Sequence, residues 1–227
     1  MYRVEDKYVC SSIDLFLLQA KIGTILKSDS NQNSEDGYSV ISVYFDDLYD
    51  THLCDTIDGN SVREKYRIRI YNNSFDVIKL EVKYKRYNRV AKKSKTITFE
   101  QMQSLLMGRQ IPDSASMDDP ATLFNIAMEK RGLRPKVIVA YERKAYVFGP
   151  GNVRITFDRN IRSSDCVGTF GKADIIYDVP REYNSVLEVK YDEFFPNFIA
   201  GLLELGNMQQ LPYSKYRLCR EMYMGGE

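Results

Sequence analysis

Residues 62–71, VREKYRIRIY, alternate between charged and apolar side chains. The odd positions from Arg63 to Arg69 are all cationic, and the even positions from 66 to 70 are tyrosine or isoleucine. The same alternation recurs in VIKLEVKYKR (77–86), AKKSKTITF (91–99), NVRITFD (152–158) and SVLEVKY (185–191). Because successive side chains of a strand point to opposite faces, each segment predicts a strand with one apolar and one charged face.

Other segments complete the predicted elements. YSVISVYFDD (38–47) and KVIVAYERKAYVF (136–148) also predict strands, and the turn signals NNS and GPG indicate hairpins after positions 71 and 148. Apolar residues spaced by three and four predict helices over 13–27, 99–108, 121–132, 198–205 and 216–224. Ser11 and Ser12 are suitable caps for the first helix. The pattern predicts an α+β fold over a single domain, 1–227.

The sign of the charges is more informative than the alternation itself. A half-buried sheet with a solvated polar face explains any single strand, but solvated faces usually mix charges, because like charges on neighbouring strands repel. In the first hairpin nearly every charge is a cation. Guanidinium and ammonium groups crowded in this way favour a multivalent anion such as a phosphate chain. If helices cover the apolar faces, closing the sheet into a barrel directs the cations into one channel.

Composition narrows the function. The 227 residues contain 32 Lys and Arg against 31 Asp and Glu, and this net charge of +1 gives no whole-protein argument for nucleic acid or an anionic membrane. Single-stranded RNA binding through tyrosines is a weaker alternative, because Tyr66 and Tyr84 fall on the apolar face. The four cysteines lack a metal-binding spacing. We expect a cytoplasmic location, with no signal peptide. The sequence leaves open whether a separate membrane protein is a partner.

A few acids lie among the cations, namely Glu5, Glu81, Asp158 and Glu188. Mg²⁺ or Mn²⁺ needs only one or two carboxylates when phosphates and waters supply its other ligands. We predict Glu188 as the metal ligand. For Glu5 and Glu81, a salt bridge that orients a neighbouring cation is at least as good an interpretation.

Motifs along nearly the whole chain resemble the triphosphate tunnel metalloenzymes, and within them the vacuolar transporter chaperone (VTC) domain, a polyphosphate polymerase module. They are RVEDKY, YFDD, KYRIRIY, LEVKYK, YERKAY, VRITFD, LEVKY and PYSKY. The resemblance implies an eight-stranded antiparallel β-barrel with helices packed on the outside. It also implies a metal-dependent transferase that joins the γ-phosphate of ATP to inorganic polyphosphate inside the tunnel.

The resemblance also implies roles for individual residues. The expected catalytic clamp consists of Arg67, Arg69, Lys83, Arg143 and Arg154, and Glu188 matches the metal ligand. The expected phosphate-binding residues are Lys7, Lys92, Lys190, Ser214 and Lys215. Lys92 is chosen over Lys93 and Lys95 because the alternation of residues 91–99 turns position 92 inward.

One position departs from the wider family. Hydrolytic tunnel enzymes begin with ExExK, whereas this chain has Arg3, Glu5 and Lys7. Loss of a carboxylate favours the polymerase branch over an enzyme that activates water. A tripolyphosphatase or nucleoside triphosphatase on the same fold and a non-catalytic polyphosphate-binding module are the alternatives.

Overall fold

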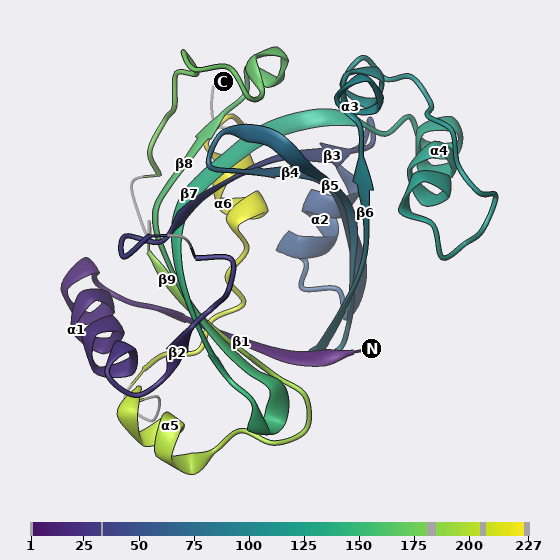
Figure 1. The fold of residues 1–227 in the computed structure, drawn as a ribbon. Helices are drawn as coiled ribbons and strands as arrows, with labels where there is room; N and C mark the ends of the chain where they lie inside the picture. The colour runs from purple at the N-terminus through teal and green to yellow at the C-terminus, as the bar shows by residue number, and fades with distance from the viewer. Residues whose placement is uncertain (1, 33, 181–184, 205–207, 225–227) are drawn as a thin grey trace.

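The computed structural model describes residues 2–32, 34–180, 185–204 and 208–224, and its main feature is a closed antiparallel barrel (Figure 1). The eight barrel strands are β1 (Arg3–Val9), β3 (Tyr38–Asp46), β4 (Val62–Tyr71), β5 (Ser74–Arg86), β6 (Arg89–Ile97), β7 (Arg134–Phe148), β8 (Val153–Ser164) and β9 (Val186–Tyr191). Their spatial order is β7-β3-β4-β5-β6-β1-β9-β8, and pairing between β7 and β8 closes the ring. The predicted eight-stranded α+β barrel is confirmed.

Strand registers place the charged faces inside the barrel. Arg67 lies opposite Tyr44 of β3 and opposite Glu81 of β5, and Arg143 lies opposite Asp158. The alternate residues, such as Ile68 and Leu80, are fully buried on the outer side. A short strand, β2 (Lys27–Ser28), adds to β7 outside the ring.

Two hairpin turns follow the sequence signals. Asn72 and Asn73, between β4 and β5, have φ angles of 51° and 52°, which suits a primed two-residue turn. Gly151, in the short 3₁₀ turn η1 (Pro150–Asn152), has a φ of 73°. A Cβ atom there would stand 2.2 Å from the Phe194 carbonyl oxygen, so glycine is required on both grounds.

Four helices cover the outer apolar faces (Figure 1). Helix α1 (Ser12–Gly23) and α5 (Asn197–Leu202) pack through Leu18, Ile22 and Ile199 on the outer side of β8 and β9. Helix α3 (Phe99–Leu106) and α4 (Pro120–Arg131) cover β3 to β6, with Phe124 at the centre of this second cluster. The predicted helices overlap these four, although position 205 of the predicted 198–205 helix lies outside the described residues.

The remaining two helices contact the inner face, which the alternation did not predict. Helix α6 (Lys215–Glu221) places Tyr216 and Cys219 against the inward apolar residues Val137 and Val139 of β7. Helix α2 (Thr51–Ile57), which the sequence did not reveal, adds Leu53 to the same cluster. In Figure 1 α6 is seen through the ring of strands.

Membrane insertion through a helix has no support in the described ranges. None of the helices there is both long and apolar enough to cross a bilayer.

Candidate functional site: a cationic tunnel

The centre of the barrel holds a narrow cavity of about 80 Å³ whose wall is largely cationic. The barrel strands and the start of α6 supply its charged residues, namely Lys7, Lys65, Arg67, Arg69, Lys83, Arg143, Glu188, Lys190 and Lys215. Tyr44, Tyr141, Tyr216 and Ser214 complete the wall. Crowding so many cations around a small volume favours a ligand that carries several negative charges.

A wider chamber adjoins the central cavity at each end. The chamber of about 310 Å³, here named the Arg154 chamber, contains Arg3, Lys92 and Arg154. The chamber of about 340 Å³, here named the Lys85 chamber, contains Arg63 and Lys85. The Lys85 chamber shares Lys7, Lys65, Lys83 and Ser214 with the central cavity. The Arg154 chamber shares Arg67, Arg69, Lys83, Arg143 and Lys190 with it. The three spaces therefore adjoin one another on the inner side of the barrel, and together they are here named the tunnel.

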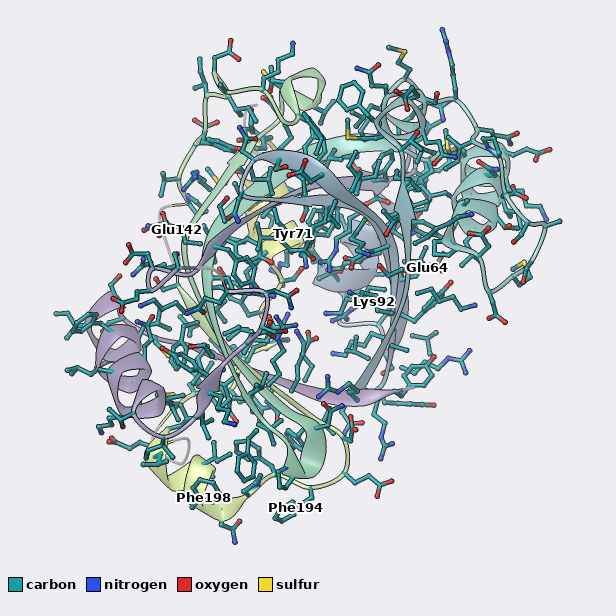
Figure 2. All side chains as sticks on the ribbon, viewed as in Figure 1. Glu64, Tyr71, Lys92, Glu142, Phe194 and Phe198 are labelled. Carbon is teal, nitrogen blue, oxygen red and sulfur yellow. The ribbon has the colours of Figure 1, made fainter. Side chains whose placement is uncertain are left out.

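The structure brings all eleven predicted site residues to this tunnel. Nine line the central cavity, namely Lys7, Arg67, Arg69, Lys83, Arg143, Glu188, Lys190, Ser214 and Lys215. Lys92 and Arg154 line the Arg154 chamber. Figure 2 shows Lys92 on the inner side of the ring, whereas Phe194 and Phe198 lie outside it near α5.

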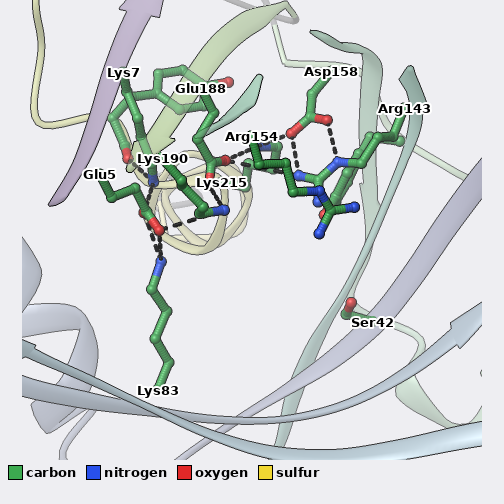
Figure 3. Close-up of polar contacts among 12 residues, drawn as sticks. Glu5, Lys7, Ser42, Lys83, Arg143, Arg154, Asp158, Glu188, Lys190 and Lys215 are labelled. Carbon is green, nitrogen blue, oxygen red and sulfur yellow. Dashed lines mark hydrogen bonds and ion pairs between the residues drawn. The ribbon is translucent and has the colours of Figure 1, made fainter. Parts of the chain in front are cut away.

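Asp158 holds two of the cations in place. Its carboxylate accepts two hydrogen bonds from Arg143, at 2.6 and 2.7 Å, and lies 2.6 Å from the Lys215 ammonium (Figure 3). Asp158 is completely buried. Burial opposes ionisation, but Arg143 and Lys215 keep the pKa of Asp158 below its usual value. The paired guanidinium is therefore fixed in direction at the wall of the central cavity.

Glu188 and Glu5 form a second cluster (Figure 3). Lys190 donates to Glu188 and lies 3.5 Å from Glu5, and Lys83 donates to Glu5 at 2.7 Å. Burial acts to raise the pKa of Glu188, but Lys190, Lys7 and Lys215 hold it well below its usual value. Both carboxylates are thus charged and surrounded by cations.

Lys83 carries the clearest sign of desolvation in this cluster. Burial lowers its pKa to about 7, and the attraction of Glu5 offsets only part of that effect. Because this pKa lies near neutrality, Lys83 changes its charge in the physiological range.

Glu81 forms a third cluster with Arg67 and Lys92. Arg67 lies 2.6 Å from the Glu81 carboxylate and also donates to the Tyr44 hydroxyl at 3.0 Å, and Lys92 donates to the other carboxylate oxygen. The neighbouring lysines of β6 point away, since Lys95 pairs with Asp119 outside the barrel. The predicted salt-bridge interpretation of Glu81 describes its contacts in the structure.

Two predicted clamp residues differ in their partners. Arg154 lies 3.0 Å from Asp29 and donates to the Tyr38 hydroxyl. Arg69 donates to Ser42 at 3.0 Å and to Tyr141 at 3.1 Å, and no ion pair joins it to a carboxylate in the described part of the chain. Arg69 is therefore a buried cation whose charge is not compensated by a direct partner.

Sequence reasoning left out several residues of the tunnel wall. Lys65 occupies the same alternation as Arg67 and could have been included on that ground. Tyr44 and Tyr141 were not recognisable, because they lie in strands whose inward positions are mostly apolar. Asp29 lies in a polar loop, and only the tertiary structure brings it to Arg154.

A metal ion held by protein groups alone has no support in residues 2–32, 34–180, 185–204 and 208–224. No group of three or more His, Cys, Asp or Glu side chains there could hold one. The lone histidine, His52, is buried beside Asp46, 3.0 Å away, outside the tunnel wall.

Comparison with solved structures shows the same fold in distant proteins. A putative adenylyl cyclase from Hippeastrum, described as revealing a dominant triphosphatase activity, aligns with a TM-score of 0.56 and 13% identity over 97% of this chain and 95% of its own. A putative adenylate cyclase from Bacillus halodurans has the same score and identity over 93% of both chains. A putative adenylate cyclase from Vibrio parahaemolyticus scores 0.52 at 13% identity, covering 96% of this chain and 97% of its own.

Sequence comparisons give the family. A search of curated proteins found no match. The sequence model of the VTC domain, in contrast, matches residues 2–223, which is nearly the whole chain. The chain therefore belongs to the VTC domain family.

Proposed function

We propose that this protein is a metal-dependent polyphosphate polymerase, which transfers the γ-phosphoryl group of ATP to inorganic polyphosphate. The observation that carries the proposal is the convergence of the eleven predicted residues on one tunnel, whose cations outnumber its carboxylates. Membership of the VTC domain family supports the same substrate class.

The proposed reaction needs positioning and charge neutralisation more than a protein nucleophile. Arg67, Arg69, Lys83, Arg143 and Arg154 would clamp the triphosphate of ATP. A terminal oxygen of the acceptor chain attacks the γ-phosphorus, the bond from that phosphorus to the β,γ-bridging oxygen breaks, and ADP leaves with the bonding electrons. The fixed guanidinium groups neutralise the charge on the phosphoryl oxygens during transfer.

The residues fit a Mg²⁺ or Mn²⁺ ion that is held mainly by the substrate. Glu188 offers one ionised carboxylate at the wall of the central cavity, and a metal of this kind completes its octahedron with phosphate oxygens and waters. The bound ion would supply further charge neutralisation at the phosphates. Lys190 and Lys215 would orient Glu188 from the sides.

A triphosphatase is the second candidate, since the Hippeastrum protein of the same fold is described as having that activity. Water would then replace the acceptor chain. Arg3 weakens this candidate, because it stands in place of a carboxylate of the hydrolytic motif. Its guanidinium lines the Arg154 chamber and lies 2.9 Å from Asp192. A module that binds polyphosphate without turnover is the non-enzymatic alternative.

Incubation with ATP and Mn²⁺, followed by a gel stained for polyphosphate, separates these functions. We expect long phosphate chains from the wild-type protein and none from Glu188→Gln. Glu142→Gln is the matched control, because Glu142 pairs with Arg159 and lies apart from the tunnel wall. Release of free phosphate without chains would establish a triphosphatase. Binding of polyphosphate without any product would support the module that binds without turnover.

A further inference from the structure

Strands β4 and β5 place like charges directly opposite each other at one end of the tunnel. At this end Arg63 pairs with Lys85 and Lys65 pairs with Lys83. The next inward residue, Arg67, pairs with the acid Glu81, and a third cationic pair, Arg69 with Lys79, follows beyond it. Like charges in directly opposite positions destabilise a sheet. The two cationic pairs therefore need an explanation other than the stability of the barrel.

Lys65 contacts a hydroxyl and an aromatic ring, and the Asp46 carboxylate attracts its charge only from beyond ion-pair distance. Its ammonium donates to the Ser214 hydroxyl at 2.7 Å and lies 5.3 Å from the centre of the Tyr216 ring. No ion pair with a carboxylate involves Lys65, Arg63 or Lys85 among the residues that the structure describes. Burial, together with nearby cations, lowers the pKa of Lys65 well below its usual value. Burial therefore disfavours the charged form of Lys65, and an anion bound beside it would favour that form.

The two acids that line the Lys85 chamber contact groups other than Arg63, Lys65 and Lys85. Glu5 accepts from Lys83, and Asp6 accepts from Tyr191 at 3.2 Å and from Gln210 at 2.7 Å. In the Arg154 chamber, by contrast, Lys92 and Arg154 each have a carboxylate within 3.0 Å. The cations that line the Arg154 chamber alone, Arg3, Lys92 and Arg154, are thus paired with carboxylates. Arg63 and Lys85, which line the Lys85 chamber alone, form no ion pair in the described part of the chain.

Lys65 also marks the junction between two spaces. It lines both the central cavity of about 80 Å³ and the Lys85 chamber of about 340 Å³. From Arg69 to Arg63 the inward cations follow one strand over roughly 20 Å, at about 3.3 Å per residue. A linear anion in the central cavity therefore meets a continuous row of cations leading into this chamber.

We propose that Lys65, Arg63 and Lys85 form a second polyanion subsite, which holds the part of a phosphate chain that extends beyond the central cavity and so selects long chains over triphosphate. This inference rests on the proposed function, since it assigns the growing chain to one end of the same tunnel. In this arrangement the phosphate oxygens bridge the opposed cations, and the repulsion between the two strands becomes attraction to the ligand.

Calorimetric titration with inorganic triphosphate and with long-chain inorganic polyphosphate, in metal-free buffer without ATP, tests the subsite. We expect Lys65→Gln and Lys85→Gln each to weaken the affinity for the long chain by about 10-fold, which corresponds to the loss of one charge-assisted hydrogen bond. The affinity for triphosphate should change less than the affinity for the long chain. Lys93→Gln is the matched control, since it removes a lysine from the outer face of the same barrel.

The outcomes separate this inference from the proposed function. A ratio of long-chain to triphosphate affinity that stays at the wild-type value in both variants overturns the subsite, even when triphosphate binds tightly. Absence of binding for either ligand overturns the proposed function together with the subsite. Lys85→Gln is the variant less liable to misfold, because Lys85 is only partly buried. The circular dichroism spectrum of this variant should match that of the wild-type protein.

Discussion

The two ends of the tunnel use the same residue types in different ways. Around the Arg154 chamber, acids such as Asp158, Glu81 and Asp29 fix the directions of their cations. Around the Lys85 chamber, Arg63 lies opposite Lys85 and Lys65 lies opposite Lys83. Among the described residues, Arg63, Lys65 and Lys85 form no ion pair with a carboxylate. A paired cation is held in position before a ligand arrives, whereas an unpaired one gains most when an anion binds. We therefore expect the paired cations to position the phosphate groups and the unpaired cations to contribute mainly to binding affinity.

The largest effect should follow from breaking the paired end at Asp158. Asp158→Asn leaves Arg143 and Lys215 buried with less compensation, and losing one partner of a buried ion pair costs about 3 to 5 kcal/mol. Urea denaturation should show a much lower midpoint. Asp118→Asn is the control, because its 93% exposed side chain pairs with Lys93 at the surface, and its midpoint should hardly move. Equal midpoints for the two variants would contradict the structural role of Asp158.

Arg69 tests an unpaired cation within the central cavity. Arg69→Met should reduce transition-state stabilisation by about 2 to 4 kcal/mol, by analogy with the loss of one oxyanion donor. Because no carboxylate is left behind, the free energy of unfolding should change far less than in Asp158→Asn. Measurement of kcat/KM for ATP alongside urea denaturation checks both expectations. Full activity in Arg69→Met would argue strongly against the clamp.

Tyr216 connects α6 to the barrel beneath Lys65. Its hydroxyl donates to the buried Asp46 carboxylate at 2.5 Å, and its ring stacks on Tyr44. Tyr216→Phe removes one donor to a charged group, which costs about 1.5 to 3 kcal/mol. Thermal denaturation measures this cost. Tyr49→Phe, at an 85% exposed residue, should leave the melting temperature unchanged, and a similar drop in both variants would exclude the Asp46 contact as its cause.

Lys83 lines the central cavity and both chambers. The change of its charge with pH should have the smallest effect on ligand binding among these predictions. With a pKa lowered to about 7, Lys83 is charged below that pH and loses its charge above it. Its contribution to triphosphate binding should therefore decline as the pH rises from about 6 to 8. Lys83→Arg stays charged throughout, so the ratio of wild-type to variant affinity should fall a few-fold across this range. A constant ratio would show that the Lys83 charge does not change in this range.

The sequence pattern predicted seven of the eight barrel strands, and alternation showed which face of the charged strands points inward. The eighth strand, β1, entered only through the family resemblance of its RVEDKY motif. Arg67, Glu81, Lys92 and Glu188 lie on the inner face because strand geometry is local, and the outward positions are apolar enough to bind helices. The closed eight-stranded barrel was implied by the family resemblance, whereas the alternation shows only that closure would direct the cations into one channel. The unpredicted α2 has no long apolar period, since it spans only seven residues.

Only the tertiary structure decided which charges meet. Asp158 and Lys215, Glu5 and Lys83, or Lys65 and Ser214 are far apart in the chain, and their contacts depend on strand register and on closure of the ring. The packing of α6 likewise depends on the inward apolar residues of β7. Alternation indicates which face of β7 these residues occupy, but it does not indicate which helix packs on them. Sequence fixes the direction of a side chain through local geometry, whereas compensation of its charge is a property of the assembled tunnel.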